Sequence, residues 1–335
     1  MTVLVWGGKA KVDSLPKPVS NNAVASLKSG GHELLFSMMG IGPKKTWDAI
    51  TAEGHALDTA TGDWTDLTPV PGIGRIAAAA VGVRERVYLF GGYTVDARGN
   101  EITVPDVNIL DLKSGRWARA ADLPVAVDDA VAGVYSDRYI YVIGGWSKNQ
   151  AVRNVQVYDT EKDKWEQATP IAGTPVFGHS GSLIGSTIVY VDGARANPSG
   201  ERPKYVSSDE CWMGKIDAID MTKIAWTRLA KHPGSARYRI AAGTPEKGER
   251  IYFSGGTDNP YNYNGIGYDG KPSEPSPVTF AFNVKSGEWE VIQQDTPDPT
   301  MDHRGLLVTE QELIILGGME KGQVVTDRVE IIPAK

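Results

Sequence analysis

The sequence lacks most of the features that mark a disulfide-rich, membrane-spanning or metal-binding protein. Cys211 is the only cysteine among 335 residues, so the chain cannot form an internal disulfide. No apolar stretch is long enough to cross a bilayer as a helix, so no membrane partner is predicted. Histidine and cysteine nowhere recur at the spacing of a zinc site. We therefore predict no metal and no cofactor.

Concentrated positive charge is also missing. The chain has 35 Lys and Arg against 41 Asp and Glu, a net charge of −6, and no run of basic residues. Nucleic-acid binding depends on clustered cations that neutralise phosphates, so no nucleic-acid partner is predicted. There is no phosphate-cradling glycine loop and no Gly-x-Ser-x-Gly elbow, two common signatures of catalytic sites.

What the chain does contain is a short apolar phrase that ends in Gly-Gly. It reads VYLFGGY from position 87, IYVIGGW from 140, IYFSGGT from 251 and LIILGGM from 313. IVYVDGA from 188 and LFSMMGI from 35 are altered copies. Such a phrase is typical of a strand that runs into a tight turn. Six copies separated by 48 to 63 residues indicate a repeat architecture.

A tryptophan follows five of the six copies, after 21 to 34 residues, and it closes the pattern into a circle. Trp64, Trp117, Trp165, Trp226 and Trp289 hold this place. The chain ends soon after the sixth Gly-Gly, but Trp6 and Leu15-Pro16 repeat the pattern of Trp117 and Leu123-Pro124. The N-terminal segment is therefore predicted to supply the outer strand of the last repeat, which leaves no open sheet edge.

The period, the Gly-Gly after a strand and the later tryptophan together resemble the kelch repeat. The resemblance covers nearly the whole chain. It implies an all-β, six-bladed β-propeller of four-stranded antiparallel blades, with strand a beside the axis and strand d outside. A β-helix or a pair of sandwiches does not explain the circular tryptophan register. One domain is predicted over 1–335, with blades near 22–70, 75–124, 128–171, 178–233, 238–296, and 302–335 plus 1–16.

Such a propeller would place the d–a and b–c connections on one face, around the mouth of the axial channel. Loops on a rigid scaffold usually carry function, so we expect the site there. Aligning the blades on strand a, with RIAA at 75 matched to RIAA at 239, gives one residue per blade. The predicted ring is Asn22, Arg75, Asp128, His179, Arg239 and Arg304, with His303 adjacent.

Three arginines in this ring suit a carboxylate or phosphate, which a guanidinium can grip in bidentate fashion. A small anionic or sugar ligand is therefore predicted. The alternative is that each arginine pairs with an acid from a neighbouring blade and only ties the blades together. Asp128, Asp129 and Asp302 are available for that purpose.

Two long b–c loops, 193–215 and 257–277, could reach the same mouth. Tyr261 and Tyr263 stand among Asn and Gly in the second loop, and Glu101 lies on another b–c loop. Aromatic faces and amides of this kind suit a sugar. The tyrosines could equally form the core of a long loop.

The ending GGMEKGQVVTDRVEI (317–331) is similar to the close of the bacterial sialic acid mutarotase (N-acetylneuraminate epimerase) group of kelch propellers. The resemblance implies a base and an acid near the anomeric hydroxyl and an anion clamp for the sugar carboxylate. His179, His303 and Asp128 would act as acid or base. Arg75, Arg239 and Arg304, with Asn22, Asp129, Glu101 and the tyrosines, would bind the ligand.

One position departs from that group. Its members are expected to have a Glu after the blade glycine and then an Arg, but this chain has Ala194 there, and Glu201 and Arg202 follow later. Whether the chain is an enzyme therefore stays open. The ligand set of the kelch-type copper galactose oxidases cannot be assembled either, and Cys211 is expected to be a small buried thiol.

The alternative function belongs to a different class. Many kelch propellers present this face to a protein, and an arginine-rich mouth could grip acidic peptide segments. A deep mouth would favour a sugar, and a shallow one would favour a peptide. A monomer is expected. The sequence shows no signal peptide, but a trimmed leader would look the same, so cytoplasm and periplasm both stay open.

Overall fold

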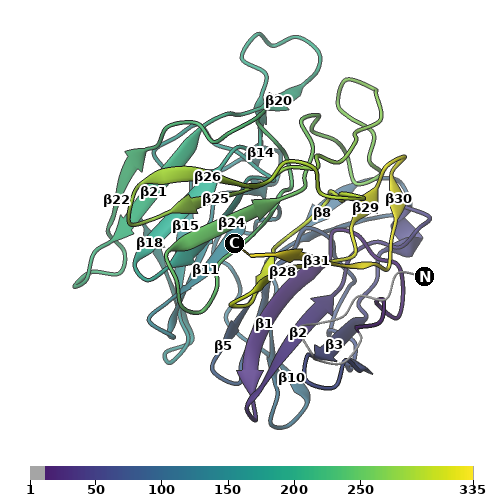
Figure 1. Ribbon diagram of the computed structural model, residues 1–335, viewed down its shortest axis with the longest axis vertical. Coiled ribbons are helices and arrows are strands. Elements are labelled where there is room, and N and C mark those ends of the chain that lie inside the picture. The colour runs from purple at the N-terminus through teal and green to yellow at the C-terminus, as the bar shows by residue number, and fades with distance from the viewer. Residues whose placement is uncertain (1–11, 335) are drawn as a thin grey trace.

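The structure, a computed structural model, describes residues 12–334 and confirms an all-β propeller of six antiparallel sheets around one axis (Figure 1). Within that range the only helical segment is the single 3₁₀ turn Trp47–Ala49, and no helix there has the length and apolar character to cross a membrane.

The strands of each blade run from the axis outward. Blade 1 contains β1 (Ala23–Ser29), β2 (His32–Met38), β3 (Gly54–Asp58) and β4 (Trp64–Asp66); blade 2 contains β5 (Ala79–Val83), β6 (Arg86–Phe90), β9 (Val107–Asp111) and β10 (Arg116–Arg119). Blade 3 contains β11 (Val131–Tyr135), β12 (Tyr139–Ile143), β15 (Val155–Asp159) and β16 (Lys164–Ala168); blade 4 contains β17 (Ser180–Ile184), β18 (Thr187–Val191), β21 (Cys211–Ile216) and β22 (Ile224–Arg228). Blade 5 contains β23 (Ala241–Gly243), β24 (Arg250–Ser254), β25 (Thr279–Asn283) and β26 (Glu288–Gln293); blade 6 contains β27 (Leu307–Val308), β28 (Glu312–Leu316) and β31 (Val329–Pro333).

Four small hairpins extend the b–c connections beyond the blades. They are β7 (Tyr93–Val95) with β8 (Glu101–Thr103), β13 (Trp146–Ser147) with β14 (Gln150–Ala151), β19 (Ala194–Ala196) with β20 (Tyr205–Ser207), and β29 (Met319–Glu320) with β30 (Val324–Val325). We call the side that carries the b–c and d–a connections the loop face, and the side that carries the a–b turns the turn face. The loops around β20 and over 257–277 project at the top of Figure 1.

The predicted closing strand near Trp6 lies outside the described residues. The segment that follows it runs beside blade 6: Leu15 N–H donates to Asp327 O at 2.8 Å, and Val19 N–H donates to Thr326 O at 3.2 Å. Val12, Leu15 and Val19 share one core cluster with residues of blades 1 and 6.

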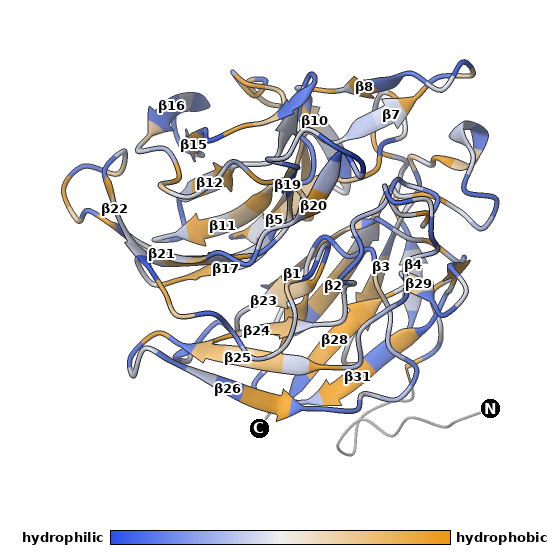
Figure 2. Cartoon of the chain, turned by 90° about the horizontal axis from the view of Figure 1, so that it is seen from above, coloured by the Kyte–Doolittle hydropathy of each residue, from blue (hydrophilic) through white to orange (hydrophobic). Residues whose placement is uncertain are grey.

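The inner strands are made of small residues because they approach one another closely. A Cβ on Gly243 would lie 2.0 Å from the carbonyl oxygen of Leu306, and one on Gly82 would lie 2.4 Å from that of Ser26. Strand b is apolar along most of its length because neighbouring blades cover it, and orange segments follow these strands in Figure 2.

The repeated tryptophans join each blade to its neighbour. The Nε1–H of Trp117 donates to Thr68 O at 2.8 Å, that of Trp165 to Ala121 O at 2.8 Å, and that of Trp289 to Ala230 O at 2.9 Å. Trp64 and Trp226 make the equivalent bonds to Asp13 O and Thr169 O. The tryptophans of the repeat are therefore structural.

Candidate functional site

Each blade enters its inner strand through one residue with positive φ. These residues are Asn21, Ala77, Asp129, Gly178, Arg239 and Asp302, with φ between 51° and 76°. Only one is a glycine, although the left-handed region is costly for other residues. Strained positions of this kind gather at functional sites, which makes the ring a site candidate.

Hydrogen bonds connect this ring from blade to blade. Asp129 N–H donates to Ala77 O, Gly178 N–H to Asp129 O, and Arg239 N–H to Gly178 O, at 2.8 to 3.0 Å. His303 N–H donates to Arg239 O, Asn21 N–H donates to Asp302 O, and Ala77 N–H donates to the side-chain oxygen of Asn21. The loop-face end of the axis is therefore held by a closed circle of bonds.

The structure corrects the alignment behind the predicted ring. Arg75 does not correspond to Arg239. Its counterpart is Arg237, because the Nη1 of each donates to the carbonyl oxygen of the first glycine of its own Gly-Gly, Gly91 at 2.8 Å and Gly255 at 3.2 Å. Because residues 237 and 239 are both arginine, either can be aligned with Arg75. Aligning the two RIAA sequences selects Arg239, which is not the structural counterpart.

The other predicted ring positions are displaced by one or two residues. Asn22, Asp128 and His179 each neighbour a ring residue, and Arg304 lies two positions beyond Asp302. Asn22 is buried and donates to Ser37 Oγ at 2.8 Å and to Leu316 O at 3.2 Å. Arg75 is 1% exposed, and its Nη2 also donates to Asn108 Oδ1 at 2.6 Å. Both side chains hold the scaffold.

At the centre of the ring, four charged side chains form what we call the axial ion-pair cluster: Asp129, Arg239, Asp302 and Arg304. Arg239 donates to Asp129 through Nε at 3.1 Å and Nη2 at 2.8 Å, and to Asp302 through Nη1 at 2.7 Å. Arg304 Nη1 lies 2.5 Å from Asp129 Oδ1. All four side chains are at most 3% exposed.

The charges of this cluster cancel one another. Burial acts to raise the pKa of Asp129, but the guanidinium groups of Arg239 and Arg304 lower it, so this carboxylate stays ionised. Two cations face two anions, and Ser20 and Asn21 donate further hydrogen bonds to Asp302. For Arg239 and Arg304, this geometry corresponds to the second of the two interpretations of the sequence, in which the arginines pair with acids from other blades and tie the blades together.

An aromatic layer covers the cluster on the loop face. Tyr261 OH donates to Asp302 Oδ1 at 2.9 Å, and Tyr238 OH donates to Asp129 Oδ2 at 3.2 Å. Tyr261 is fully buried, and its ring meets that of Tyr238 edge-on. Tyr263 packs against a core cluster that contains Ile41, Ile76 and Tyr93, so the 257–277 loop reaches residues of blades 1 and 2. In this layer the loop tyrosines act as a core.

Two carboxyl groups remain beside this layer without a cation bound to them in the described structure. Glu101 and Thr103 lie two residues apart on β8 and so share one side of that strand. Thr103 Oγ1 donates to Asp128 Oδ2 at 2.8 Å. Burial, followed by the charge of Asp129, holds the pKa of Asp128 well above its usual range, and burial also raises the pKa of Glu101. Asp128 is buried, whereas Glu101 has an exposed side and is only partly desolvated by the protein atoms around its carboxyl group.

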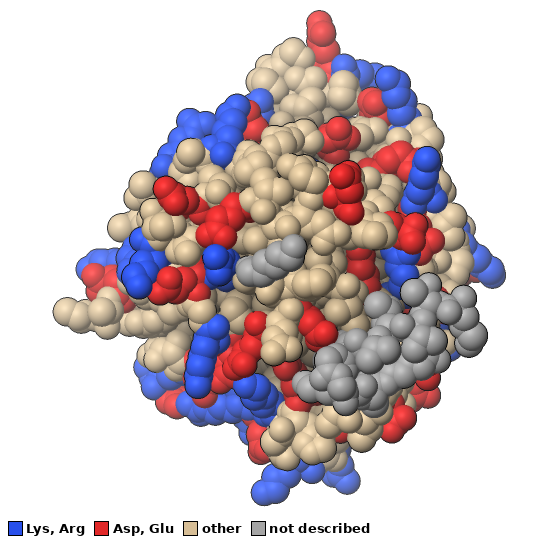
Figure 3. Space-filling model, in the orientation of Figure 1, with Lys and Arg blue, Asp and Glu red and all other residues tan. Residues whose placement is uncertain are grey.

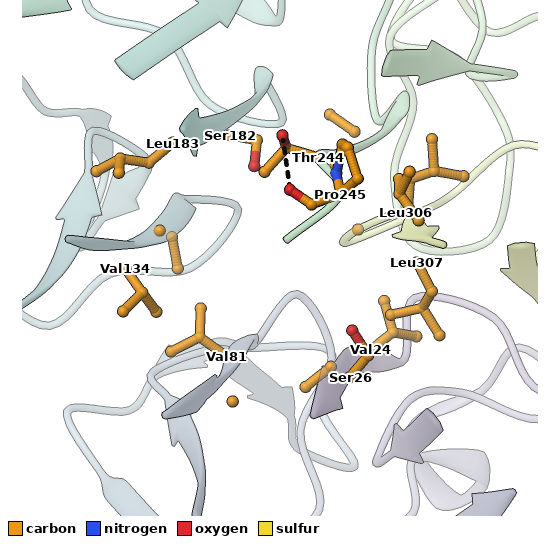
Figure 4. A pocket seen from close by; sticks show the side chains of 18 of the residues that line it. Val24, Ser26, Val81, Val134, Ser182, Leu183, Thr244, Pro245, Leu306 and Leu307 are labelled. Atoms are coloured by element: carbon orange, nitrogen blue, oxygen red, sulfur yellow. Dashed lines mark hydrogen bonds between the residues drawn. The ribbon is translucent and has the colours of Figure 1, made fainter. Parts of the chain in front are cut away.

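The two candidate histidines lie between blades, beside the Gly-Gly turns: His179 Nε2 is 3.0 Å from Ile143 O, and a Cβ on Gly318 would lie 2.5 Å from Cε1 of His303. His179, His303 and Arg304 line the inner end of an axial channel of about 1010 Å³, and the a–b turns of all six blades line its wide end. Figure 4 shows Val24, Val81, Val134 and Leu306 around this channel. Burial lowers the pKa of each histidine to about 4, so both rings are neutral.

The surface of the loop face carries exposed apolar side chains. Trp47 is 49% exposed, Ile73 54%, Ile102 50% and Val324 56%, and all four lie on b–c or d–a connections of blades 6, 1 and 2. Figure 3, which views the molecule from the side with the loop face at the top, shows positive and negative side chains interspersed. Of these four, Ile73, Ile102 and Val324 are the residues that sequence reasoning missed, because the sequence alone could not distinguish them from core residues.

Comparison with known proteins agrees with this architecture. Residues 35–256 match the KLHDC2/KLHL20/DRC7 Kelch-repeats domain. The chain is 30% identical over 184 residues to Kelch-like protein terF of Aspergillus terreus, covering 52% of this chain and 39% of that protein. It is 27% identical over 197 residues to human Kelch domain-containing protein 3, covering 54% and 48%. The chain thus spans less than half the length of these curated relatives.

A solved structure shares the fold over almost the whole chain. The structure titled "Structure of YjhT" superposes with a TM-score of 0.74 and covers 96% of this chain and 99% of that one, at 16% sequence identity. At that identity the likeness establishes the fold alone. With the family match over residues 35–256 and the six sheets around one axis, the chain belongs to the kelch-repeat family of β-propellers.

Proposed function

We propose that this propeller is a recognition module that binds a protein segment across its loop face. The observation that carries the proposal is the set of exposed apolar side chains on adjacent blades, Trp47, Ile73, Ile102 and Val324. Large apolar side chains that gather on one face of a soluble domain are typical of an interaction surface. Tryptophan in particular dominates the energetics of such contacts.

The charges at the centre of this face select the chemistry of the partner. The arginines are paired with Asp129 and Asp302, so they offer no free guanidinium to an acidic peptide. Glu101 has a partly exposed carboxyl group next to this neutral cluster. A partner segment with apolar side chains and one Lys or Arg is therefore favoured over the acidic segment that the sequence predicted.

Selection of peptides from a display library on the full chain tests the proposal. We expect enriched peptides to combine apolar residues with a basic one, and the substitution Trp47→Ser to weaken their binding by about 30-fold or more. Ile219→Ser is the matched control, because Ile219 is 95% exposed but lies between β21 and β22, away from the loop face. Peptides that bind the Trp47→Ser and wild-type proteins equally, or no enrichment at all, would overturn the proposal.

A second candidate is a sugar mutarotase, which the pair Asp128 and Glu101 favours. A buried carboxylic acid beside a partly solvent-exposed carboxyl group can supply the proton donor and the proton acceptor that anomer interconversion requires. An acidic sugar would have to displace Asp129 or Asp302 from the arginines. A neutral sugar has no such requirement and is the better fit to this centre.

Proton NMR of anomer interconversion separates the two candidates. Freshly released anomers of sialic acid, uronic acids and neutral sugars would be followed with wild-type protein and with Glu101→Gln, Asp128→Asn and Ile219→Ser. A mutarotase would accelerate at least one sugar and lose that acceleration in the first two variants only. If no sugar equilibrates faster than in buffer, the mutarotase candidate is excluded.

A further inference from the structure

A second cluster of reactive side chains lies in blade 4, away from the loop-face centre. Asp192 follows β18, Cys211 begins β21 opposite Val191, and His232 lies on the connection to blade 5. A carboxylate oxygen, the thiol sulfur and an imidazole nitrogen all lie within 4.8 Å of one another. The three residues are 1%, 1% and 6% exposed. Their separation in sequence explains why no metal-ligand spacing was visible there.

The orientation of His232 is the one that metal-bound histidines adopt. Its Nδ1 lies 2.9 Å from Pro233 O and donates a hydrogen bond to that carbonyl, which leaves Nε2 as the lone-pair nitrogen. Nε2 points at Asp192 Oδ2 at 2.7 Å, so these two acceptor atoms share one proton. The ring is stacked on Phe280 at 4.4 Å, which fixes its direction.

Asp192 is also arranged as a ligand with one oxygen to spare. Its Oδ2 accepts Arg237 N–H at 2.8 Å, whereas Oδ1 is buried and has no hydrogen-bond partner among the described residues. A buried carboxylate oxygen without a partner carries a desolvation cost that a bound cation would remove. Asp192 also has φ of 61° at a position where most copies of the repeat have glycine. Glycine would adopt this backbone conformation at lower cost, so the conformation does not explain the presence of an aspartate.

We propose that Asp192, Cys211 and His232 bind one transition-metal ion of the Zn²⁺ class. A thiolate, an imidazole and a carboxylate form a ligand set for zinc or cobalt, whereas Ca²⁺ and Mg²⁺ require oxygen ligands. Binding would release two protons, one from the Cys211 thiol and one shared by Asp192 and His232. The two negative charges that result balance the ion, so the buried site stays neutral overall.

Cobalt(II) titration of the full chain, after treatment with a chelator, tests the proposal. We expect a thiolate-to-cobalt charge-transfer band that saturates at one equivalent and is abolished when Zn²⁺ is added. Cys211→Ser should lose the band, and His232→Gln should weaken cobalt binding by about 10-fold or more. The matched control is His32→Gln, which alters an exposed His–Asp pair with Asp58 that has no cysteine beside it.

The same experiment can overturn the proposal. Absence of the band in the wild-type chain at several equivalents of Co²⁺, or a band that persists in Cys211→Ser, would exclude the site. If Cys211→Ser does not fold, as judged by circular dichroism, His232→Gln gives the decision: affinity equal to wild type excludes the site.

Discussion

The two ends of the propeller axis are built in opposite ways. At the loop face, charged side chains from blades 3, 5 and 6 fill the axis, and tyrosines cover them. At the turn face, six short turns surround an open channel lined by alanine, glycine, serine and aliphatic residues and, at the turns, by charged residues such as Lys28, Arg84 and Glu310. One sequence repeat therefore produces a closed end by ion pairing and an open end by small side chains.

At the closed end, Arg239 and Arg304, two of the three arginines that the sequence suggested as a ligand clamp, are paired with Asp129 and Asp302. A buried ion pair is costly to break because it leaves an unpaired charge away from water. The closed end therefore depends on a few residues that cannot be exchanged singly. The open end depends on the absence of side-chain volume at many positions.

The largest expected effect is at the closed end. Arg239→Met removes the guanidinium that bridges Asp129 and Asp302, so we expect the free energy of unfolding to fall by about 3–5 kcal/mol. Lys28→Ala is the control at the open end, where the exposed Lys28–Glu246 pair should contribute at most about 1 kcal/mol. Urea unfolding measures both. Losses of similar size in the two variants would show that the cluster does not stabilise the closed end.

A smaller effect is expected in the channel wall. Gly243→Ala would place a Cβ 2.0 Å from Leu306 O, so the inner strands of blades 5 and 6 must separate. We expect a loss of about 1–3 kcal/mol. Gly42→Ala is the matched control, since its nearest neighbour would be 3.7 Å away. If thermal unfolding gives equal midpoints for the two variants, the inner strands are not closely packed in solution.

The third effect is at the boundary between the two ends, and it is absent near neutral pH and develops only in acid. The pKa of His303 is lowered by burial from 6.5 to about 4, so between these values the unfolded chain binds a proton that the folded chain does not. Stability should therefore fall as the pH drops from about 6.5 to about 4. His303→Gln should reduce this slope by about 1.4 kcal/mol per pH unit.

A series of urea unfolding curves between pH 4 and 7 measures that slope. Burial raises the pKa of Glu330 to about 7, which has the opposite effect: its contribution is lost as the pH rises through 7. The comparison between wild type and His303→Gln cancels this contribution. An unchanged slope in the variant would mean that His303 is hydrated and that the channel's inner end is open to water.

Much of the fold could be predicted from the sequence because the repeat has two markers at fixed positions. Gly-Gly locates the end of strand b, and Trp117 and its counterparts locate strand d, so the number of blades follows from counting. The RIAA sequences at 75 and 239, on which strand a was aligned, do lead into the inner strands β5 and β23. The outer strand predicted near Trp6 stays a prediction.

The candidate site could be predicted only in part, because the amino-acid sequence does not reveal the backbone conformation of single residues. The ring is defined by positive φ, and Ala77 and Asp302 give no sign of it in the sequence. Nor could the sequence tell whether Arg239 faces a ligand or an acid. That depends on Asp302, which lies 63 residues away in the chain and is brought to the axis only by the closure of the ring.

The composition of the axial ion-pair cluster also has a consequence for synthesis of the chain. Asn21 belongs to the first blade and Asp302 to the last, and the two are separated by 281 residues. A growing chain that has emerged only as far as blade 5 contains Asp129 and Arg239 but not the acid and the arginine that complete the cluster. The axis can therefore close only after blade 6 has been made, and a chain that stops before residue 302 would keep the closed end of the propeller permanently unfinished.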